Sequence, residues 1–261
     1  MLKRILLKIF GLRNVLRVKA IQERYFLTGV QRREILFRKV FYSQFVKRDD
    51  LCFDVGANRG NRIPSLLAIG ARVVAVEPQE SCCRFLKDKF GEGIVIVQSG
   101  LGETACVRDF YIGEVSVLSS FSSEWIDSVK KSSRFPQHSW SKVVQVQITT
   151  LDKLIERYGV PHFIKIDVEG YELEVLKGLS HPIGMISFEY TVPEQTQKIV
   201  ECVNEIERSN VHIECNYSIG ESMVFALQTW VSPKGLVELV QTKPFWDTGF
   251  GDIYVRSVTH G

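Results

Sequence analysis

A glycine-containing segment that includes an aspartate is the first feature of this chain that suggests chemistry. The segment has the sequence FDVGANRG and spans residues 53–60. Its glycines, Gly56 and Gly60, would let the backbone approach a ligand where a strand passes into a helix, whose first N–H groups are free. The spacing G-x-x-x-G differs from the G-x-G-x-x-G turn that binds the pyrophosphate of a dinucleotide. The segment therefore favours a nucleoside that carries a sulfonium group and no phosphate, with Asp54 near its amino-acid end.

A second acid, Glu77, is placed to bind a ribose. It follows the next predicted strand, roughly twenty residues after the glycine segment, which is the spacing at which an acid contacts ribose hydroxyls in nucleotide-binding folds. A carboxylate can accept hydrogen bonds from both vicinal hydroxyls. NAD and S-adenosylmethionine carry the same ribose, so Glu77 supports a nucleoside cofactor without distinguishing the two.

Three acids follow a predicted buried strand in the segment FIKIDVEGYE, residues 163–172. Ligands of open α/β sheets bind beyond the carboxyl ends of the strands. Asp167 and Glu169 are therefore expected to face the reacting group. Glu172, and Glu174 just after it, are instead expected to be favourable acids in the first turn of the next helix.

The elements that must position these residues alternate along the chain. From residue 49 onward, apolar runs alternate with helical patterns, which predicts a mostly parallel α/β sheet with helices on both faces. The predicted strands are Leu51–Val55, Arg72–Val76, Ile94–Gln98, Ala105–Ile112, Val143–Ile148, Phe163–Asp167, Met185–Glu189, Val211–Cys215, Met223–Leu227 and Asp252–Arg256. The predicted helices are 60–69, Ser81–Phe90, Leu173–Gly178 and Pro193–Ser209.

Five short motifs in a fixed order give the chain a specific resemblance. They are FDVGANRG, VEP, TTLDKL at residues 149–154, FIKIDVEGYE, and SFEY at residues 187–190. Over residues 50 to 190 or so, the chain resembles the FkbM family of S-adenosylmethionine-dependent methyltransferases, and IDVEG is the most distinctive motif. The resemblance implies a Rossmann-like class I methyltransferase fold and O-methylation of a hydroxyl on a sugar, glycan or secondary metabolite.

The resemblance also implies which residues bind the cofactor S-adenosylmethionine. The methionine end would lie against Asp54, Gly56, Asn58 and Gly60, the ribose against Glu77, and the adenine near Ser99, Gly100 and Leu101. Acceptor specificity is expected to depend on the loop 113–140 and on the aromatic residues around Trp230 and Phe245-Trp246, because variable loops carry specificity.

Methyl transfer to an alcohol requires a base that removes the hydroxyl proton. The candidates are Asp167 and Glu169. Glu189 would contact the substrate hydroxyl or support the other two carboxylates, whereas His138 is predicted to be an exposed loop residue. Lys165 lies inside a buried strand and needs a charged partner, for which Asp167 or Glu189 is available. No metal is predicted, because an oxygen-ligand site at these three acids lacks a further carboxylate at clear spacing.

Charge is divided unevenly along the chain. Residues 1–48 contain thirteen Lys or Arg and two acids, so their formal charge is +11, and the remainder carries −8 within a total of +3. We therefore predict a basic helical extension over residues 1–48 and a methyltransferase domain over residues 49–261. Apolar residues at three- and four-residue steps predict an amphipathic helix over residues 2–19. That helix would pack on the body, contact an anionic membrane through residues 1–20, or attract an anionic substrate.

Cysteine usage and hydropathy bear on the cellular location. The six cysteines are scattered and form no C-x-x-C motif, which argues against a zinc site or a disulfide framework and favours a reducing compartment. The basic extension is too charged and its apolar stretch too short for a membrane span, and no cleavage site typical of a secretory signal follows it. The predicted location is the cytoplasm, with peripheral contact at the inner membrane face as a further option.

Other classes of function share parts of the pattern. An NAD-dependent oxidoreductase or epimerase would share Glu77, but it requires G-x-G-x-x-G and a Tyr/Lys pair at catalytic spacing, and neither occurs. A non-catalytic binding protein could keep the fold and dock through its basic arm, although Asp54, Glu77 and Asp167 argue against this. A nucleic-acid substrate is not expected, because the body is acidic and lacks interleaved aromatic and basic residues.

Overall fold

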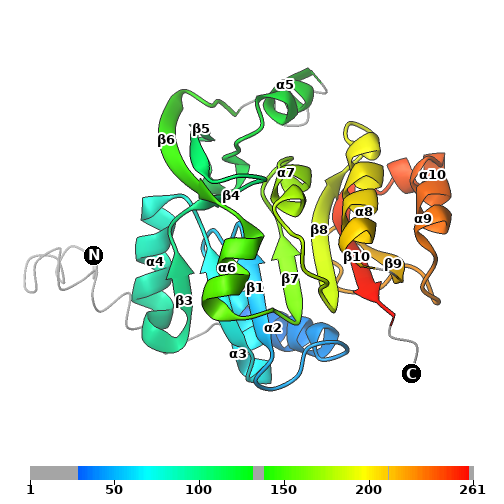
Figure 1. The fold of residues 1–261 in the computed structure, drawn as a ribbon, viewed down its shortest axis with the longest axis horizontal. Coiled ribbons are helices and arrows are strands. Elements are labelled where there is room, and N and C mark those ends of the chain that lie inside the picture. The colour runs from blue at the N-terminus through cyan, green and yellow to red at the C-terminus, as the bar shows by residue number, and fades with distance from the viewer. Residues whose placement is uncertain (1–28, 132–137, 211, 259–261) are drawn as a thin grey trace, which may run out of the picture.

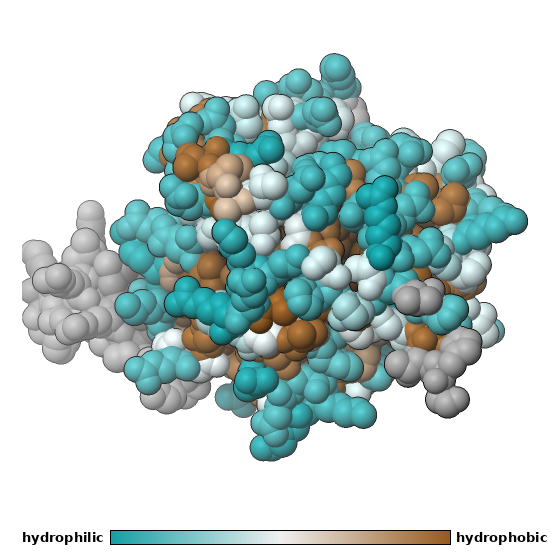
Figure 2. Space-filling model, in the orientation of Figure 1, coloured by the Kyte–Doolittle hydropathy of each residue, from teal (hydrophilic) through white to brown (hydrophobic). Residues whose placement is uncertain are grey.

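The structure is a computed structural model that describes residues 29–131, 138–210 and 212–258. The amphipathic helix predicted over residues 2–19 lies outside this part of the chain. Among the described residues, none of the helices combines the length and the apolar character that crossing a bilayer would require. The face drawn in Figure 2 is mainly hydrophilic, with small and separate apolar patches.

Seven strands form the central sheet in the order β3-β2-β1-β7-β8-β10-β9 (Figure 1). Neighbours from β3 to β8 are parallel, whereas β10 is antiparallel to both β8 and β9. The strands are β1 (Leu51–Val55), β2 (Arg72–Val76), β3 (Val95–Val97), β7 (Phe163–Ile166), β8 (Met185–Thr191), β9 (Ile213–Ile219) and β10 (Phe250–Ser257). The strand order reverses beside β1, so a ligand site is expected at the carboxyl ends of β1 and β7. This topology confirms the predicted Rossmann-like class I fold.

Helices cover both faces of the sheet and bury two separate apolar cores. On one face lie α2 (Gly29–Tyr42), α3 (Ile63–Ile69) and α4 (Glu80–Phe90), and on the other lie α6 (Leu151–Tyr158), α7 (Glu172–Lys177), α8 (Thr196–Ser209), α9 (Pro233–Val240) and α10 (Lys243–Trp246). β1 serves both cores because its side chains alternate: Phe53 and Val55 face one core and Cys52 the other. Burial on both faces explains why every residue of this strand except Asp54 is apolar.

A smaller sheet of order β4-β6-β5 stands above the large one at the top of Figure 1. Its strands are β4 (Gly100–Leu101), β5 (Cys106–Ile112) and β6 (Lys142–Thr149), and the short helix α5 (Ser123–Lys131) lies beside it. α5 buries Trp125, Ile126 and Val129 in a third small core. This stretch lies in the segment 113–140, which was expected to be a loop. The helix begins after Ser122, whose hydroxyl accepts the N–H of Trp125 at 3.0 Å.

Several predicted elements needed correction. The strand predicted over Met223–Leu227 is wrong, because this segment is irregular and is held instead by the side chain of Asn216, which binds the N–H and C=O of Leu227. The strand predicted at Val211–Cys215 is Ile213–Ile219, and the helix predicted from Pro193 begins at Thr196. Helices α5, α6, α9 and α10 were not predicted, whereas α2 lies within the helical extension predicted over residues 1–48.

Five of the six cysteines are buried, Cys106 is half-buried, and all six are free thiols. This agrees with the prediction that there is no disulfide framework. The last part of the predicted basic extension packs with the body, since Phe41, Tyr42 and Val46 are buried in the same core as β1 and α3.

Candidate functional site

One cleft extends along the carboxyl ends of β1, β2, β7 and β8, below the smaller sheet. It joins the glycine segment at one end to the acids that follow β7 at the other. Its lining includes ten of the eleven residues predicted for the site: Asp54, Gly56, Asn58, Glu77, Ser99, Gly100, Leu101, Asp167, Glu169 and Glu189. The strand ends bring these residues together although they are spread over 136 positions of the chain.

Gly56 makes the sharp turn that ends β1. Its φ is +79°, a region that favours glycine, and a methyl group here would overlap the main-chain carbonyl oxygen of Asp167. The N–H of Gly56 donates to the carbonyl of Val76 at 3.0 Å. Gly60, the eleventh predicted residue, does not line the cleft, because it lies behind the turn against Leu86 and Phe90.

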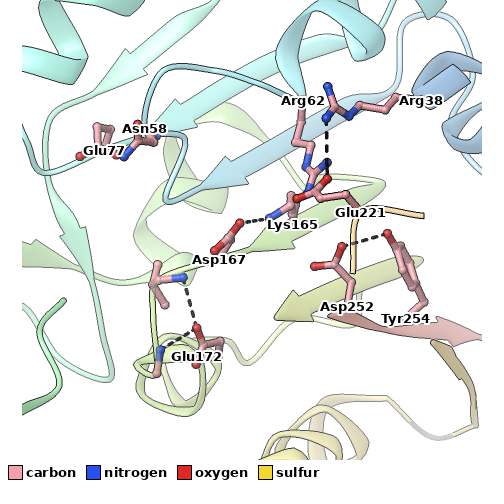
Figure 3. Close-up of polar contacts among 12 residues, drawn as sticks. Arg38, Asn58, Arg62, Glu77, Lys165, Asp167, Glu172, Glu221, Asp252 and Tyr254 are labelled. Carbon is pink, nitrogen blue, oxygen red and sulfur yellow. Dashed lines mark hydrogen bonds and ion pairs between the residues drawn. The ribbon is translucent and has the colours of Figure 1, made fainter. Parts of the chain in front are cut away.

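Glu77 is buried at the end of β2 and holds the glycine turn in place. One carboxylate oxygen accepts the N–H of Asn58 at 2.8 Å, and the other accepts the N–H of Gln79 at the same distance. Figure 3 shows Glu77 and Asn58 side by side. Burial raises the pKa of Glu77 to about 7, although the hydrogen bonds from Gln79 and Asn58 oppose the shift. A carboxylate has about four acceptor positions, so lone pairs remain for a ligand.

Asp54 is buried at the bottom of the cleft. Burial raises its pKa to about 6, and the nearby charges of Lys165 and Arg62 limit the rise. Its Oδ2 atom makes no hydrogen bond to any described part of the protein. A buried oxygen without a partner is costly unless a ligand supplies a donor. Together with the turn at Gly56, which lines the cleft, this unmatched acceptor fits a bound group that carries an ammonium or hydroxyl donor.

Asp167, Glu169 and Glu189 form a cluster of carboxylates at the other end of the cleft. One oxygen from each lies within 4.8 Å of those of the other two. Burial acts to raise the pKa of Asp167, but the ammonium of Lys165, 2.6 Å away, outweighs it and lowers that pKa. Burial and the neighbouring negative charges raise the pKa values of Glu169 and Glu189 well above the usual range. These shifts favour the protonated forms of Glu169 and Glu189, and the titration of the cluster belongs to the group as a whole.

Two contacts fix the backbone that carries Glu169. Glu172 is buried, and its Oε1 accepts the N–H groups of Val168 and Gly170 at 3.2 and 3.1 Å (Figure 3). Glu172 and Glu174 lie in the first turn of α7, as was expected, and Glu172 in addition closes the turn after β7. Ser120 donates to the carbonyl of Glu169 at 2.7 Å. Glu169 itself has a φ of +54°, which is uncommon for a residue with a side chain and is held here by its surroundings.

Charged residues behind the cluster form a second network (Figure 3). Lys165 is buried, and burial alone would lower its pKa, but Asp167 and Asp252 raise it, so its charge is retained. Arg62 makes two hydrogen bonds to the carboxylate of Glu221, one of them 2.7 Å long. Glu221 also lies 3.7 Å from Arg38. Each buried cation therefore has a carboxylate partner, as such burial requires.

Several residues that line the cleft were not predicted from the sequence. Arg62, Asn61 and Gln79 follow the glycine segment and β2, whereas Ser116 and Phe121 come from the serine-rich loop that was expected to determine the acceptor. Ser116 donates to the side-chain oxygen of Asn58 at 3.1 Å, so this loop lies against the glycine turn. Glu221 had no signal, because it meets Arg62 across 159 positions of the chain.

The aromatic residues expected to contact the acceptor near the C-terminus lie elsewhere. Phe245 is buried against Tyr190, with ring centroids 4.9 Å apart. Neither Trp230 nor Trp246 lines the cleft. Ser99 lines it, but its hydroxyl donates to the carbonyl of Gln147 at 2.7 Å. The hydroxyl of Ser99 is therefore left to act only as an acceptor toward a ligand.

Comparisons with known proteins add the following. A family model described as the methyltransferase FkbM domain matches residues 54–219. The hexuronic acid methyltransferase AglP of Haloferax volcanii is 26% identical over 149 residues, which cover 54% of this chain and 55% of that protein. The chain thus matches about half the length of this relative.

Solved structures resemble the fold at low identity. A precorrin-6y C5,15-methyltransferase from Geobacter metallireducens is 11% identical with a TM-score of 0.44, covering 85% of this chain and 86% of that one. An O-methyltransferase from Bacillus cereus in complex with SAH is 15% identical with a TM-score of 0.39, covering 98% and 96%. The strand order described above carries the fold assignment.

Proposed function

Because the chain belongs to the FkbM family of methyltransferases, we propose that it transfers a methyl group from S-adenosylmethionine to a hydroxyl oxygen of a sugar. The cofactor follows from membership of the family. The observation that carries the choice of a hydroxyl is the cluster of Asp167, Glu169 and Glu189 at one end of the cleft. A hydroxyl must lose its proton during transfer, and a cluster of carboxylates that can bind protons is suited to accept it. A carboxylate acceptor would need no such base.

The sugar class is supported by the relative that modifies hexuronic acid, although its match covers about half of each chain. The cleft is lined by several polar side chains, among them Asn61, Ser119 and the carboxylates. A sugar presents several hydroxyl groups that such side chains can bind. We propose a free sugar or a glycan as the acceptor.

We assign the cofactor site to the part of the cleft around the glycine turn. Asp54, with its unmatched buried oxygen, and the turn at Gly56 and Asn58 would contact the amino-acid end. Glu77 would accept hydrogen bonds from the ribose hydroxyls. Adenine would lie against the segment Ser99, Gly100 and Leu101, next to the ring of Phe121, all of which line the cleft.

The cofactor supplies an activated methyl group on a sulfonium, and the chain must position the acceptor in line with it. The sequence analysis placed proton removal on Asp167 or Glu169. The ion pair with Lys165 makes Asp167 the weakest base of the cluster. We therefore assign proton removal to Glu189 or Glu169. These carboxyl groups would ionise more readily with the sulfonium of the cofactor nearby. The acceptor oxygen would bond to the methyl carbon as the bond from that carbon to sulfur breaks and S-adenosylhomocysteine leaves, while the hydroxyl proton would pass to the carboxylate.

The test is methyl transfer to a pair of matched glycosides, one of a neutral hexose and one of a hexuronic acid. We expect S-adenosylhomocysteine to form only with acceptor present, and the methylated product to resist mild alkali because an ether is formed. An alkali-labile methyl ester would overturn the assignment of the acceptor group. Binding of the cofactor with no turnover on any hydroxyl compound would instead favour a non-catalytic role.

Cofactor affinity is expected to depend on pH through Glu77. Its pKa is about 7 in the free protein. Hydrogen bonds from ribose hydroxyls would favour the ionised carboxylate and lower that pKa, so binding releases a proton. Affinity for S-adenosylhomocysteine should therefore fall as the pH drops through 7, by up to about tenfold per pH unit. Calorimetric titration in buffers with different ionisation enthalpies would count the proton.

The matched variant for this experiment is Glu77→Gln, which should bind more weakly and lose most of the pH dependence. A residual dependence centred near pH 6 would belong to Asp54, whose pKa is about 6. An affinity of the unaltered protein that stays constant, or rises, as the pH falls would contradict the assignment of Glu77 to the ribose.

A further inference from the structure

Helix α2 has an inner face that is tied to the body. Phe41 and Tyr42 are buried in the core shared with α3, and the carbonyl of Ile35 accepts a hydrogen bond from Ser65 at 3.1 Å. Arg38 lies on the same side, 4.0 Å from Glu34 and 3.7 Å from Glu221. The orientation of the helix on the protein is therefore fixed, and so is the face that it turns outward.

The outer face of α2 exposes large apolar side chains. The exposed fractions are 67% for Val30, 58% for Leu36, 51% for Phe37 and 70% for Val40. Leu36, Phe37 and Val40 are spaced at three and four residues, so they share one side of the helix. Arg33 precedes Leu36 by three residues, so it lies on the same side of the helix, and it is also exposed. A helix that buries part of one face and leaves its more apolar face uncovered calls for a partner.

We propose that this outer face of α2, defined by Val30, Arg33, Leu36, Phe37 and Val40, docks on an anionic lipid bilayer. A helix that lies in a membrane interface combines an apolar stripe with flanking Lys and Arg. α2 meets that description, because it contains four Lys or Arg against one acid, and Arg32 and Arg33 are both exposed. Two more cations, Lys47 and Arg48, follow it in the sequence and are exposed as well.

Charge distinguishes the bilayer from the two other occupants that could cover the face. Residues 1–28 contain seven Lys or Arg and one acid, so laying them on α2 would bring like charges together. A second copy of the chain that used the same face would also set one basic helix against another. An anionic bilayer is complementary to both segments, and each Lys or Arg near such a surface contributes about 1 kcal/mol to binding.

Docking through α2 would place the cleft near the membrane. Arg38 on the inner face contacts Glu221, and Glu221 lines the cleft and binds Arg62. The outer and inner faces of a helix are separated by its diameter, roughly 10 Å with side chains. One wall of the cleft would thus stand about one helix diameter from the lipid headgroups, in a fixed orientation.

The experiment is flotation of the full chain with two kinds of vesicle, phosphatidylcholine alone and phosphatidylcholine mixed with phosphatidylglycerol. We expect binding to the anionic vesicles only, and weaker binding as salt is raised. The variant Leu36→Gln/Phe37→Gln/Val40→Gln should lower the bound fraction at least about tenfold, since it removes the apolar stripe. The matched control is Val107→Gln/Val160→Gln, which alters exposed valines outside α2 and should bind as before.

Other outcomes would overturn the proposal. Failure of the full chain to bind anionic vesicles would do so, as would unchanged binding by the triple variant. If the full chain does not bind and the triple variant lowers the melting temperature, the face is covered by residues 1–28. If a dimer of the full chain dissociates in the triple variant, the occupant is a second copy. Affinity for S-adenosylhomocysteine should be the same in all these proteins, which separates this test from that of the proposed function.

Discussion

Replacing Glu189 with glutamine is expected to lower kcat by at least about a hundredfold, the contribution typical of a positioned base. Glutamine keeps the size of the side chain but cannot accept the proton of the acceptor hydroxyl. Glu189 stands on β8, where its backbone pairs with Asp252 of β10. The fold and the cofactor site should therefore survive, and affinity for S-adenosylhomocysteine should change by no more than a few fold.

The pH profile gives this experiment a second readout. Burial and the charges of Asp167 and Glu169 raise the pKa of Glu189, so the unaltered enzyme should gain activity as the pH rises and the cluster loses protons. In the variant this rise should flatten. The control is Glu80→Gln, an exposed acid paired with Arg84 on α4. A Glu189→Gln enzyme that keeps most of its kcat, or an unchanged profile, would remove Glu189 from the reaction.

Replacing Gly56 with alanine should weaken the binding of the cofactor by about a hundredfold or more. An L residue in this left-handed conformation costs about 1–2 kcal/mol. The added methyl group would also overlap the carbonyl oxygen of Asp167, so the turn would have to move away from β7. Such a movement would displace Asn58 from Glu77 and separate the two walls of the cofactor site.

Titration with S-adenosylhomocysteine and a thermal melt would measure the effect of Gly56→Ala, and both affinity and melting temperature should fall. Gly93→Ala is the matched control, because a methyl group there meets nothing within 4 Å and the residue lacks a positive φ. It should leave both quantities unchanged. Normal affinity in Gly56→Ala would mean that the turn has room the structure does not show.

The parts of the fold that were predicted well are those in which burial leaves a direct pattern in the sequence. Leu51–Val55 and Arg72–Val76 were predicted with the observed bounds, because a strand buried on both faces is an uninterrupted apolar run. α9 begins with the sequence PKG and therefore does not give the usual helical pattern.

Within the site, motifs predicted which residues face the cleft but not how they interact. Asp167 and Glu169 are two positions apart, yet Lys165 forms an ion pair with Asp167, whereas the pKa of Glu169 is raised. This difference arises from the direction of single side chains, which the sequence does not record. The same holds for Glu172, which looks like an ordinary helix acid and instead binds the turn before its own helix.

The position of β10 has a consequence for how the protein is made. β10 lies between β8 and β9, yet it is synthesised about thirty residues after β9. While the chain emerges from the ribosome, the free edge of β8 therefore has no partner, and β9 cannot join the sheet directly. Unpaired strand edges attract other chains. The strand that bears Glu189 therefore gains its second neighbour only after residues 250–257 have been made.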